Sequence, residues 1–449
     1  MKQLPEEFLK RMRVLLPDEK EYESFLASYE QPPSRGIRLN LQKLMHCRGL
    51  SYEQLVSEWG LEPLPAASFL ELSDGRRLYR EFYVNEERMT ELGIRPGKHP
   101  YHEAGLYYLQ EPSAMQVVPA LEIRPFDRVL DLCASPGGKS TQAADMLDYR
   151  QGGILISNEY VGNRARTLSS NIERLGIPGA AVLNEDTGRL ASALPGYFSR
   201  IILDAPCSGE GMFRKDDTAI AEWSPENVTH CVARQKEIAD NALQLLAPGG
   251  RLSYSTCTFE TAEDEGVRDY ILEKDPELEL VYEKRIFPHR ERGEGHYVAV
   301  FRKAGQDLTA AAEDITLREE KNGDVTYLVP ESLPSLRGLR VLRKGVPVSE
   351  LLKKRESPHH AMSHACRLCV LPGDPLDGLS MPLPTLDFPA EDPRVSQYLH
   401  GLEISVTGEE AGDLKGGFVI IACGGAALGL GKYVNGRVKN HYPKGLRFV

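Results

Sequence analysis

The sequence has no long apolar run and little cysteine, and each absence excludes a class of protein. No stretch reaches the roughly 18 consecutive apolar residues that a membrane-spanning helix needs, because glycines interrupt the longest candidate, residues 418–431. The first residues are charged and lack the apolar centre of a secretory signal. Eight cysteines in 449 residues are too few for a disulfide framework. We therefore expect a cytoplasmic protein with no membrane association and with reduced thiols.

An overall excess of positive charge is also missing, which argues against a general attraction to nucleic acids. The formal net charge is −11. Two local segments differ: residues 335–355 hold seven Lys and Arg against one Glu, and residues 414–449 hold six with no acidic residue. Basic segments on an acidic chain can bring a phosphate backbone to one face. A solvated charged surface stays open as the alternative for either segment.

The length suits about three domains, and the pattern of elements divides the chain into four parts. We expect an N-terminal α+β unit at 1–100, a central α/β domain at 101–305, an intermediate C-terminal domain at 306–375 and a small α+β or β-rich C-terminal domain at 376–449. The start of the third part, residues 304–320, has the composition of a linker. The sequence after it contains many short strand-like segments and little long helix.

Within the N-terminal unit, apolar residues recur at helical spacing over residues 4–16 and 19–29. Residues 36–40 predict a strand whose basic residue, Arg38, faces outward. Further on, a proline at a position typical of a helix start predicts a helix over residues 112–118.

Residues 127–303 alternate between strand-like and helix-like segments. Strands are expected at 128–132, 154–157, 180–183, 200–203, 251–253 and 296–301. This alternation predicts a doubly wound, mostly parallel sheet with helices on both faces. In such a fold, ligands bind at the carboxyl ends of the strands.

A glycine-rich turn, Asp131–Ser140 (DLCASPGGKS), joins the first of these strands to its helix. Glycines let the backbone approach a ligand, and a helix N-terminus offers free N–H groups. The end of the turn matches a Walker loop, but Cys133 stands where that motif requires its first glycine. The dinucleotide pattern GxGxxG is absent as well. The turn therefore predicts a nucleotide-type cofactor that is not a nucleoside triphosphate.

Acidic residues end three strands beside this turn. Glu159 follows the second strand at a place that suits a pair of ribose hydroxyls. Asp186 follows the third strand and suits an adenine amino group, and Asp204 ends the fourth. For one acid alone, the capping of a helix is the simpler explanation. Three strand-end acids beside one glycine-rich turn favour a cofactor site.

Two cysteines follow the ends of the fourth and fifth strands, Cys207 in DAPCSGEG and Cys257 in STCT. A thiolate adds reversibly to an electron-poor ring, so two thiols at neighbouring strand ends predict covalent chemistry on a nucleobase. A lone cysteine is more often a small buried hydrophobic residue. That is what we expect of Cys47, Cys231 and Cys423.

One further pattern raises the question of a zinc site. It consists of Cys366, Cys369 and the upstream histidines His359, His360 and His364. A single CxxC without a matching second pair is weak evidence for zinc. We therefore expect no metal.

At these motifs the sequence resembles the RNA cytosine-5 methyltransferases of the RsmB/RsmF (Nop/Sun) class. The likeness rests on Asp131–Ser140, Asn158-Glu159 with Arg164, Asp204–Gly211 and Ser255–Thr258. The tail, Leu428–Arg447, resembles the RNA-binding extension of the RsmF type. The resemblance implies a Rossmann-like core that uses S-adenosylmethionine, an N-terminal RRM- or ferredoxin-like domain that binds RNA, and a PUA-like C-terminal domain.

The resemblance also implies roles for the motif residues. Cys257 would bond to C6 of the target cytosine, and Cys207 would help to release the product. Asp204 would hold or protonate N3, and Lys139 would keep Asp204 oriented and charged. Cofactor contacts would come from Cys133, Ala134, Ser135, Pro136, Gly137, Gly138, Lys139, Glu159, Arg164, Asp186 and Asp204. Ser135 replaces an alanine that is frequent in the family, a small change that should not affect binding.

The implied partner is RNA, either 16S ribosomal RNA or the small ribosomal subunit, with no obligate protein partner evident. RNA phosphates would contact Lys432, Arg437, Lys439 and Lys444, and Tyr433 or Tyr442 would stack on a base. Three alternatives stay open. A DNA cytosine-5 methyltransferase also uses a Pro-Cys pair, but there that cysteine is the nucleophile. Transfer RNA suits the same chemistry, and a non-catalytic RNA-binding assembly factor would keep the same fold.

Overall fold

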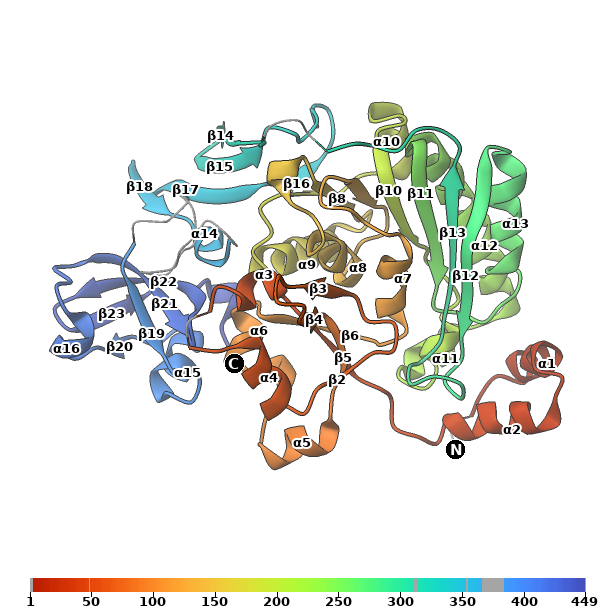
Figure 1. The fold of residues 1–449 in the computed structure, drawn as a ribbon, viewed down its shortest axis with the longest axis horizontal. Coiled ribbons are helices and arrows are strands. Elements are labelled where there is room, and N and C mark those ends of the chain that lie inside the picture. Colours follow the sequence, from red (N-terminus) through yellow and green to blue (C-terminus); the bar gives the residue numbers. More distant parts are fainter. Residues whose placement is uncertain (1–2, 48, 311–313, 353, 366–382, 449) are drawn as a thin grey trace.

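The computed structural model describes residues 3–47, 49–310, 314–352, 354–365 and 383–448. At its centre lies an eight-stranded sheet (Figure 1). The strands are β7 Arg128–Asp131, β8 Ile154–Asn158, β9 Ala180–Leu183, β10 Phe198–Asp204, β11 Leu246–Thr256, β12 Leu278–Ile286, β13 His296–Lys303 and β16 Val341–Lys344. Their order is β12-β13-β11-β10-β7-β8-β9-β16. The strands β7 to β11 run parallel, and the other three are antiparallel to their neighbours.

Helices cover both faces of this sheet, which confirms the predicted doubly wound core. They are α7 Val117–Ala120, α8 Gly138–Ala144, α9 Gly162–Arg174, α10 Thr187–Ala193, α11 Asp217–Glu222, α12 Pro225–Leu245 and α13 Glu265–Lys274. Successive strand residues point to opposite faces: Leu130 packs with Leu190 of α10, whereas Val129 packs with Leu168 of α9. Among the described residues, no helix combines the length and the apolar character needed to cross a lipid bilayer.

A smaller α+β unit packs beside α8. Its sheet has the order β2-β5-β1-β6, and its elements are β1 Gly36–Leu39, α3 Leu41–Leu44, α4 Tyr52–Glu58, β2 Glu62–Pro63, β3 Phe69–Glu71, β4 Arg77–Tyr79, β5 Glu81–Tyr83, α5 Glu86–Glu91, α6 Pro100–Glu103 and β6 Tyr107–Gln110. Because β6 pairs with β1, this unit extends beyond residue 100.

Two local predictions in this region are wrong. Arg38 does not face outward but is 2% exposed, because its guanidinium donates to the backbone carbonyls of Gly138 at 3.3 Å and Thr141 at 3.2 Å. These bonds replace the water that the cation loses on burial. The helix expected over 112–118 starts later, with a 3₁₀ turn at 114–116 followed by α7.

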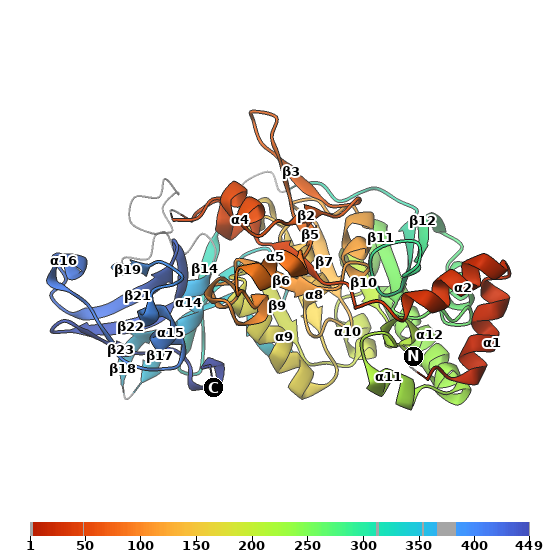
Figure 2. The ribbon, with the colours of Figure 1, turned by 90° about the horizontal axis from the view of Figure 1, so that it is seen from below.

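The two N-terminal helices lie apart from the smaller unit. They are α1 Glu6–Leu15 and α2 Glu19–Ser28, which the sequence groups with residues 31–100. Instead, Phe8 and Phe25 belong to an aromatic cluster of the central domain, with ring centroids 5.0 Å from Phe213 and 5.6 Å from Phe259 respectively. Figure 2 shows both helices beside α11 and α12, at the opposite end of the molecule from the C-terminal domain.

The C-terminal third forms two small sheets. The first has the order β14-β15-β17-β18 and the second β19-β21-β22-β23-β20. The elements are β14 Leu317–Asn322, β15 Val325–Pro330, β17 Val346–Leu352, β18 Arg355–Pro358, α14 His360–His364, β19 Thr385–Phe388, α15 Pro393–Leu399, β20 Ile404–Ser405, α16 Gly408–Ala411, β21 Gly417–Cys423, β22 Ala426–Val434 and β23 Arg437–Asn440. β14 begins inside the expected linker, so that linker is shorter than predicted. The second sheet shares one apolar cluster with the smaller α+β unit.

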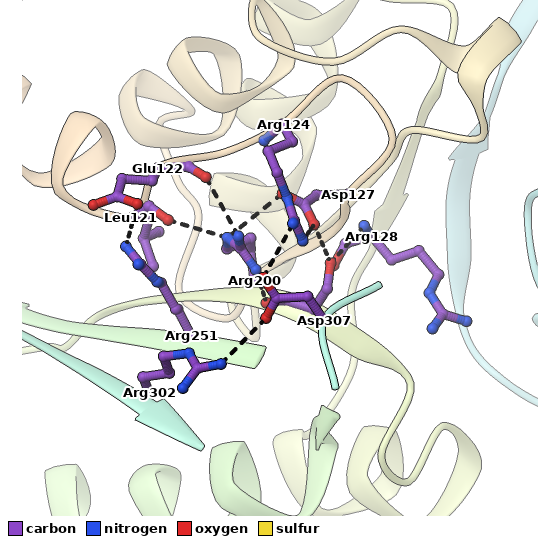
Figure 3. Close-up of polar contacts among 10 residues, drawn as sticks. Leu121, Glu122, Arg124, Asp127, Arg128, Arg200, Arg251, Arg302 and Asp307 are labelled. Atoms are coloured by element: carbon purple, nitrogen blue, oxygen red, sulfur yellow. Dashed lines mark hydrogen bonds and ion pairs between the residues drawn. The ribbon is translucent and has the colours of Figure 1, made fainter. Parts of the chain in front are cut away.

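An ion-pair network closes the amino-terminal edge of the central sheet (Figure 3). The buried carboxylate of Asp127 lies 3.5 Å from Arg200 and 3.2 Å from Arg124. Asp307, which follows β13, lies 3.2 Å from Arg124 and 3.7 Å from Arg302. The network ties the segment after β13 to the edge opposite the strand ends that carry the predicted site.

Candidate active site

The two cysteines predicted to react lie in contact at the carboxyl edge of the sheet. β10 and β11 are parallel neighbours, so the chain leaves both strands on the same side. The Sγ atoms of Cys207 and Cys257 are 3.2 Å apart, and the backbone N–H of Cys257 donates to Sγ of Cys207 at 3.3 Å. The contact with Cys257, together with burial, raises the pKa of the Cys207 thiol well above its usual value. Cys207 therefore keeps its proton at neutral pH.

Buried carboxylates hold the two loops that carry these cysteines. Oε2 of Glu263 accepts hydrogen bonds from the backbone N–H of Ser208 at 3.0 Å and from Nε2 of Gln235 at 2.7 Å. Oε2 of Glu210 accepts from the backbone N–H of Phe259 at 3.1 Å, and burial raises the pKa of Glu210 to about 7. Sequence reasoning missed Glu263 and Gln235, since no local pattern marks them.

Asp204 is ionised and held from several sides. Its Oδ2 lies 2.8 Å from Nζ of Lys139, and its Oδ1 accepts from the Ser255 hydroxyl at 2.8 Å. Burial raises the pKa of Asp204, but the charge of Lys139 and the hydrogen bonds from Lys139 and Ser255 outweigh it and hold the pKa below its usual value. The structure thus brings Lys139, Asp204 and the two cysteines to one edge of the sheet, as their motifs predict.

A histidine that sequence reasoning treated only as a strand residue also faces this site. His296 opens β13 and is 3% exposed. Its Nε2 lies 3.7 Å from Oδ1 of Asp204 and has no hydrogen-bond partner among the described residues. Burial, reinforced by the nearby charge of Lys139, lowers the pKa of His296 to about 3. The imidazole is therefore neutral.

The glycine-rich turn has the shape of a ligand cradle. Gly137 precedes α8 with φ of 111°, a conformation that residues with a Cβ rarely adopt. The turn is tied to its neighbours: the Ala134 N–H donates to the Asn158 carbonyl at 2.9 Å, and Arg164 donates to the Ser135 carbonyl at 3.0 Å. Because Asn158 is the last residue of β8, the Ala134 bond joins the turn to the end of this strand. The turn and the end of β8 therefore form one side of the cradle.

The strand-end acids are engaged in different ways. Glu159 is 4% exposed, and its Oε1 accepts from the Val161 N–H at 2.9 Å. Oδ1 of Asp186 caps α10 by accepting from the backbone N–H groups of Gly188 and Arg189. Helix capping is the simpler explanation for a single acid at a strand end. Sequence reasoning missed the adjacent Glu185, which is fully buried and accepts from the Arg340 N–H at 3.0 Å.

One buried polar atom in the cradle lacks a partner. Oδ2 of Asp131 accepts from the Ser140 hydroxyl at 2.7 Å, but Oδ1 has no partner among the described residues. Burial raises the pKa of Asp131 to about 7, and burial also raises the pKa of the Cys133 thiol above its usual range. An unpaired carboxylate oxygen beside a glycine-rich turn and a buried strand-end acid fits a ligand that carries ammonium and hydroxyl groups.

The basic residues of the tail gather on one face of a hairpin. Lys432 on β22 stands opposite Lys439 on β23, and Arg437 lies two residues from Lys439 on the same face. All three are exposed, as is Lys444 beyond β23. Like charges directly opposite each other on a sheet are unfavourable. Their gathering on one face therefore fits an anionic partner.

The predicted stacking role of two tyrosines in the tail is wrong. Tyr433 is 8% exposed and Tyr442 is 2% exposed. Tyr442 donates its hydroxyl hydrogen to Glu103 at 3.0 Å, so it joins the C-terminal domain to the smaller unit. Both rings belong to the apolar cluster between these two parts, which leaves neither free for a base.

The remaining cysteines differ in burial. Cys423 is fully buried, whereas Cys47 and Cys231 are half-buried. Cys366 and Cys369 lie outside the described residues. Within the described ranges, no group of three or more His, Cys, Asp or Glu side chains is arranged to hold a metal ion.

Four family models match consecutive parts of the chain. They are the N-terminal domain of 16S rRNA methyltransferase RsmF at 4–112, 16S rRNA methyltransferase RsmB/F at 118–302, the RsmF rRNA methyltransferase first C-terminal domain at 308–365 and the methyltransferase RsmF PUA domain at 385–448. Together the matches run from residue 4 to residue 448.

Similar proteins include relatives of almost the same extent. A ribosomal RNA small subunit methyltransferase F of Vibrio vulnificus is 30% identical over 99% of this chain and 97% of its own length. One from Salmonella paratyphi A is 29% identical over 98% and 96%. Among solved structures, NSun6 from Pyrococcus horikoshii with SFG covers 67% of this chain and 99% of its own, with a TM-score of 0.53 at 21% identity. That likeness shows the methyltransferase fold.

Proposed function

Because this chain belongs to the family of 16S rRNA methyltransferases named RsmB/F, we propose that it transfers a methyl group from S-adenosylmethionine to C5 of a cytosine in 16S ribosomal RNA. The observation that carries the proposal is the pair of sulfurs, on Cys207 and Cys257, 3.2 Å apart at the strand end that also holds the ionised Asp204. This arrangement suits transient covalent chemistry on a pyrimidine ring.

We assign the covalent step to Cys257. C5 of cytosine is too weak a nucleophile to take a methyl group unaided. When the sulfur of Cys257 bonds to C6, the electron pair of the C5–C6 double bond becomes available at C5. S-adenosylmethionine supplies the electrophilic methyl group. A base then removes the proton from C5, the double bond forms again, and the S–C6 bond breaks with its electron pair returning to sulfur.

Cys207 suits the release step. Its raised pKa keeps a proton on the sulfur, which makes Cys207 a poor nucleophile and a hydrogen-bond donor. At 3.2 Å from Sγ of Cys257, the thiol can donate to the thiolate that leaves C6 and so stabilise it. Loss of Cys207 should therefore slow release more than addition.

Asp204 suits the binding of the cytosine rather than the protonation of N3. Its lowered pKa keeps the carboxylate ionised at neutral pH, so it accepts hydrogen bonds. The exocyclic N4 amino group of cytosine offers such donors, whereas N3 of the neutral base offers only a lone pair. Lys139, 2.8 Å away, keeps the carboxylate charged. The target base must be unpaired or flipped out to reach this edge.

The residues at the cradle fit S-adenosylmethionine. Buried Glu159 would accept from the ribose hydroxyls, and the unpaired Oδ1 of Asp131 would accept from the methionine ammonium. Gly137 and Gly138 would let the backbone approach the ligand. Asp186 would contact the adenine amino group through the carboxylate oxygen that does not cap α10.

The test compares two variants and a control. With 16S rRNA and labelled donor, Cys207→Ala should accumulate a covalent RNA adduct that survives denaturing gel electrophoresis. Cys257→Ala should form neither adduct nor 5-methylcytosine. The control is Cys47→Ala, which removes a half-buried thiol from the smaller α+β unit and should behave as wild type.

Each alternative gives a different result. Adduct accumulation in Cys257→Ala, with none in Cys207→Ala, would mean a nucleophile of the DNA-enzyme type. Bisulfite mapping that finds the new methyl group in transfer RNA and not in 16S rRNA would reject 16S rRNA as the substrate. A wild-type protein that binds RNA without turnover would reject the enzyme assignment in favour of an assembly factor.

A further inference from the structure

We propose that His296 is a specificity-determining residue that accepts a hydrogen bond from the N4 amino group of the target cytosine. The inference rests on the proposed function and adds to it the means by which the site tells cytosine from uracil. The carrying observation is a ring nitrogen, Nε2 of His296, that is buried, has no partner among the described residues and lies 3.7 Å from Oδ1 of Asp204.

The position of the ring follows from the sheet. β11 and β13 are antiparallel, and Thr256 stands opposite Tyr297. Continuing this pairing by one residue places Cys257, which follows β11, opposite His296, the first residue of β13. Glycine at position 295 lets the chain before β13 pack closely against the Phe259 ring, because a Cβ at this position would lie 2.3 Å from that ring. The imidazole therefore lies at the strand end that carries the nucleophile, 3.7 Å from the carboxylate that we assign to base binding.

The hydrogen-bonding character of Nε2 follows from the other ring nitrogen. The backbone of Gly295, beside the ring, raises the pKa of His296, which is the effect of a carbonyl oxygen facing a ring N–H. Because Nε2 has no partner, this N–H is assigned to Nδ1, which places the single ring proton there and leaves a lone pair on Nε2. A low pKa makes this imidazole a poor base for the C5 proton. Its remaining use in the site is as a hydrogen-bond acceptor.

Two acceptors now face the same region, Nε2 of His296 and the carboxylate of Asp204. An amino group with two N–H donors satisfies both, and cytosine carries one at C4. Uracil carries a carbonyl oxygen at C4, which would bring a third acceptor against these two. A site built to hydrogen-bond a substrate group strongly rejects the analogue without it. The pair therefore selects cytosine over uracil before the covalent step.

The test is a cycle of two enzymes and two target bases. Wild type and His296→Phe, which keeps a flat ring but removes the acceptor, are assayed with 16S rRNA fragments carrying cytidine or 2-pyrimidinone, which lacks the amino group, at the target position. We expect His296→Phe to lower kcat/KM for cytidine about 10-fold or more and to leave the rate with 2-pyrimidinone nearly unchanged. His296→Gln, which offers an amide oxygen, should recover part of the loss.

The outcomes separate this inference from the proposed function. An equal loss with both bases would show that His296 only packs, and would overturn the inference while 5-methylcytosine formation by wild type upholds the function. Absence of 5-methylcytosine with wild type would overturn both. Donor binding by calorimetry and the thermal unfolding midpoint show whether each variant keeps the fold. If His296→Phe does not fold, the comparison of the same two bases with His296→Gln decides whether the inference holds.

Discussion

Replacing Lys139 by methionine perturbs the charge balance on which the site depends. The Lys139 side chain is 9% exposed, and its ammonium lies 2.8 Å from Oδ2 of Asp204. Methionine keeps the apolar stem and removes the charge. Burial raises the pKa of Asp204, and Lys139 is the strongest influence that lowers it. In Lys139→Met we therefore expect the pKa of Asp204 to lie above its usual value.

The expected loss of stability lies between two limits. Removing one partner of a buried ion pair costs about 3–5 kcal/mol, whereas exposed pairs contribute about 0–1 kcal/mol. Since Asp204 is 34% exposed, solvent screening puts Lys139→Met at about 2 kcal/mol of unfolding free energy near pH 7. The wild-type carboxyl has a lowered folded pKa, so its contribution is present above the unfolded pKa and is lost as the pH falls through the folded one.

The assay is the pH dependence of kcat/KM for methyl transfer between about pH 5 and 9. Lys139→Met should lose activity as the pH falls through the raised pKa of Asp204, because a protonated carboxyl no longer accepts from the base. The control is Lys303→Met, which breaks a 2.9 Å pair with Asp275 at similar burial away from the site. It should lose stability and keep the wild-type pH profile. A wild-type pH profile in Lys139→Met would refute the reasoning.

Three further predictions concern the cofactor, the RNA and the fold. Glu159→Ala should weaken S-adenosylmethionine binding about 10-fold or more in calorimetry, because it removes a charged hydrogen-bond acceptor; unchanged binding would contradict the assigned ribose contact. Lys432→Glu with Lys439→Glu should weaken RNA binding and reduce the slope of log K against log salt by about 2, whereas an equal loss of donor binding would count against a separate RNA face. Glu210 has a folded pKa of about 7 against 4.5, so wild-type stability should fall as the pH rises between these values. Glu210→Gln should remove up to about 3 kcal/mol of that dependence in urea unfolding at pH 5 and 8, and an unchanged dependence would show that Glu210 does not titrate there.

The sequence predicted the parts of the molecule that local patterns encode. Alternating strands and helices identified the doubly wound sheet, and the strand ends placed Asp204, Cys207 and Cys257 on one edge, because parallel neighbours end on the same side. The start of α12 is set by its own sequence, since the Ser224 hydroxyl caps it by accepting from the Asn227 N–H at 3.1 Å. These features need no knowledge of distant contacts.

What the sequence did not predict depends on contacts between distant residues. Arg38 was expected at the surface because isolated arginines usually lie there, but α8 supplies carbonyls that pair with it. Tyr442 is buried because Glu103, 339 positions earlier, accepts its hydrogen bond. His296 was recognised only as a strand residue, since its place beside Asp204 follows from the antiparallel return of β13. Each case requires the tertiary arrangement.

The central claim is that the sulfur of Cys257 bonds to C6 of the target cytosine. The most direct measurement uses 16S rRNA with 5-fluorocytidine at the target position, because fluorine on C5 prevents the proton loss that releases the enzyme. After reaction with S-adenosylmethionine and digestion, mass spectrometry should locate a methylated fluoropyrimidine on the peptide that contains Cys257. The same adduct on Cys207, or methylation of normal 16S rRNA with no adduct on either cysteine, would contradict the account.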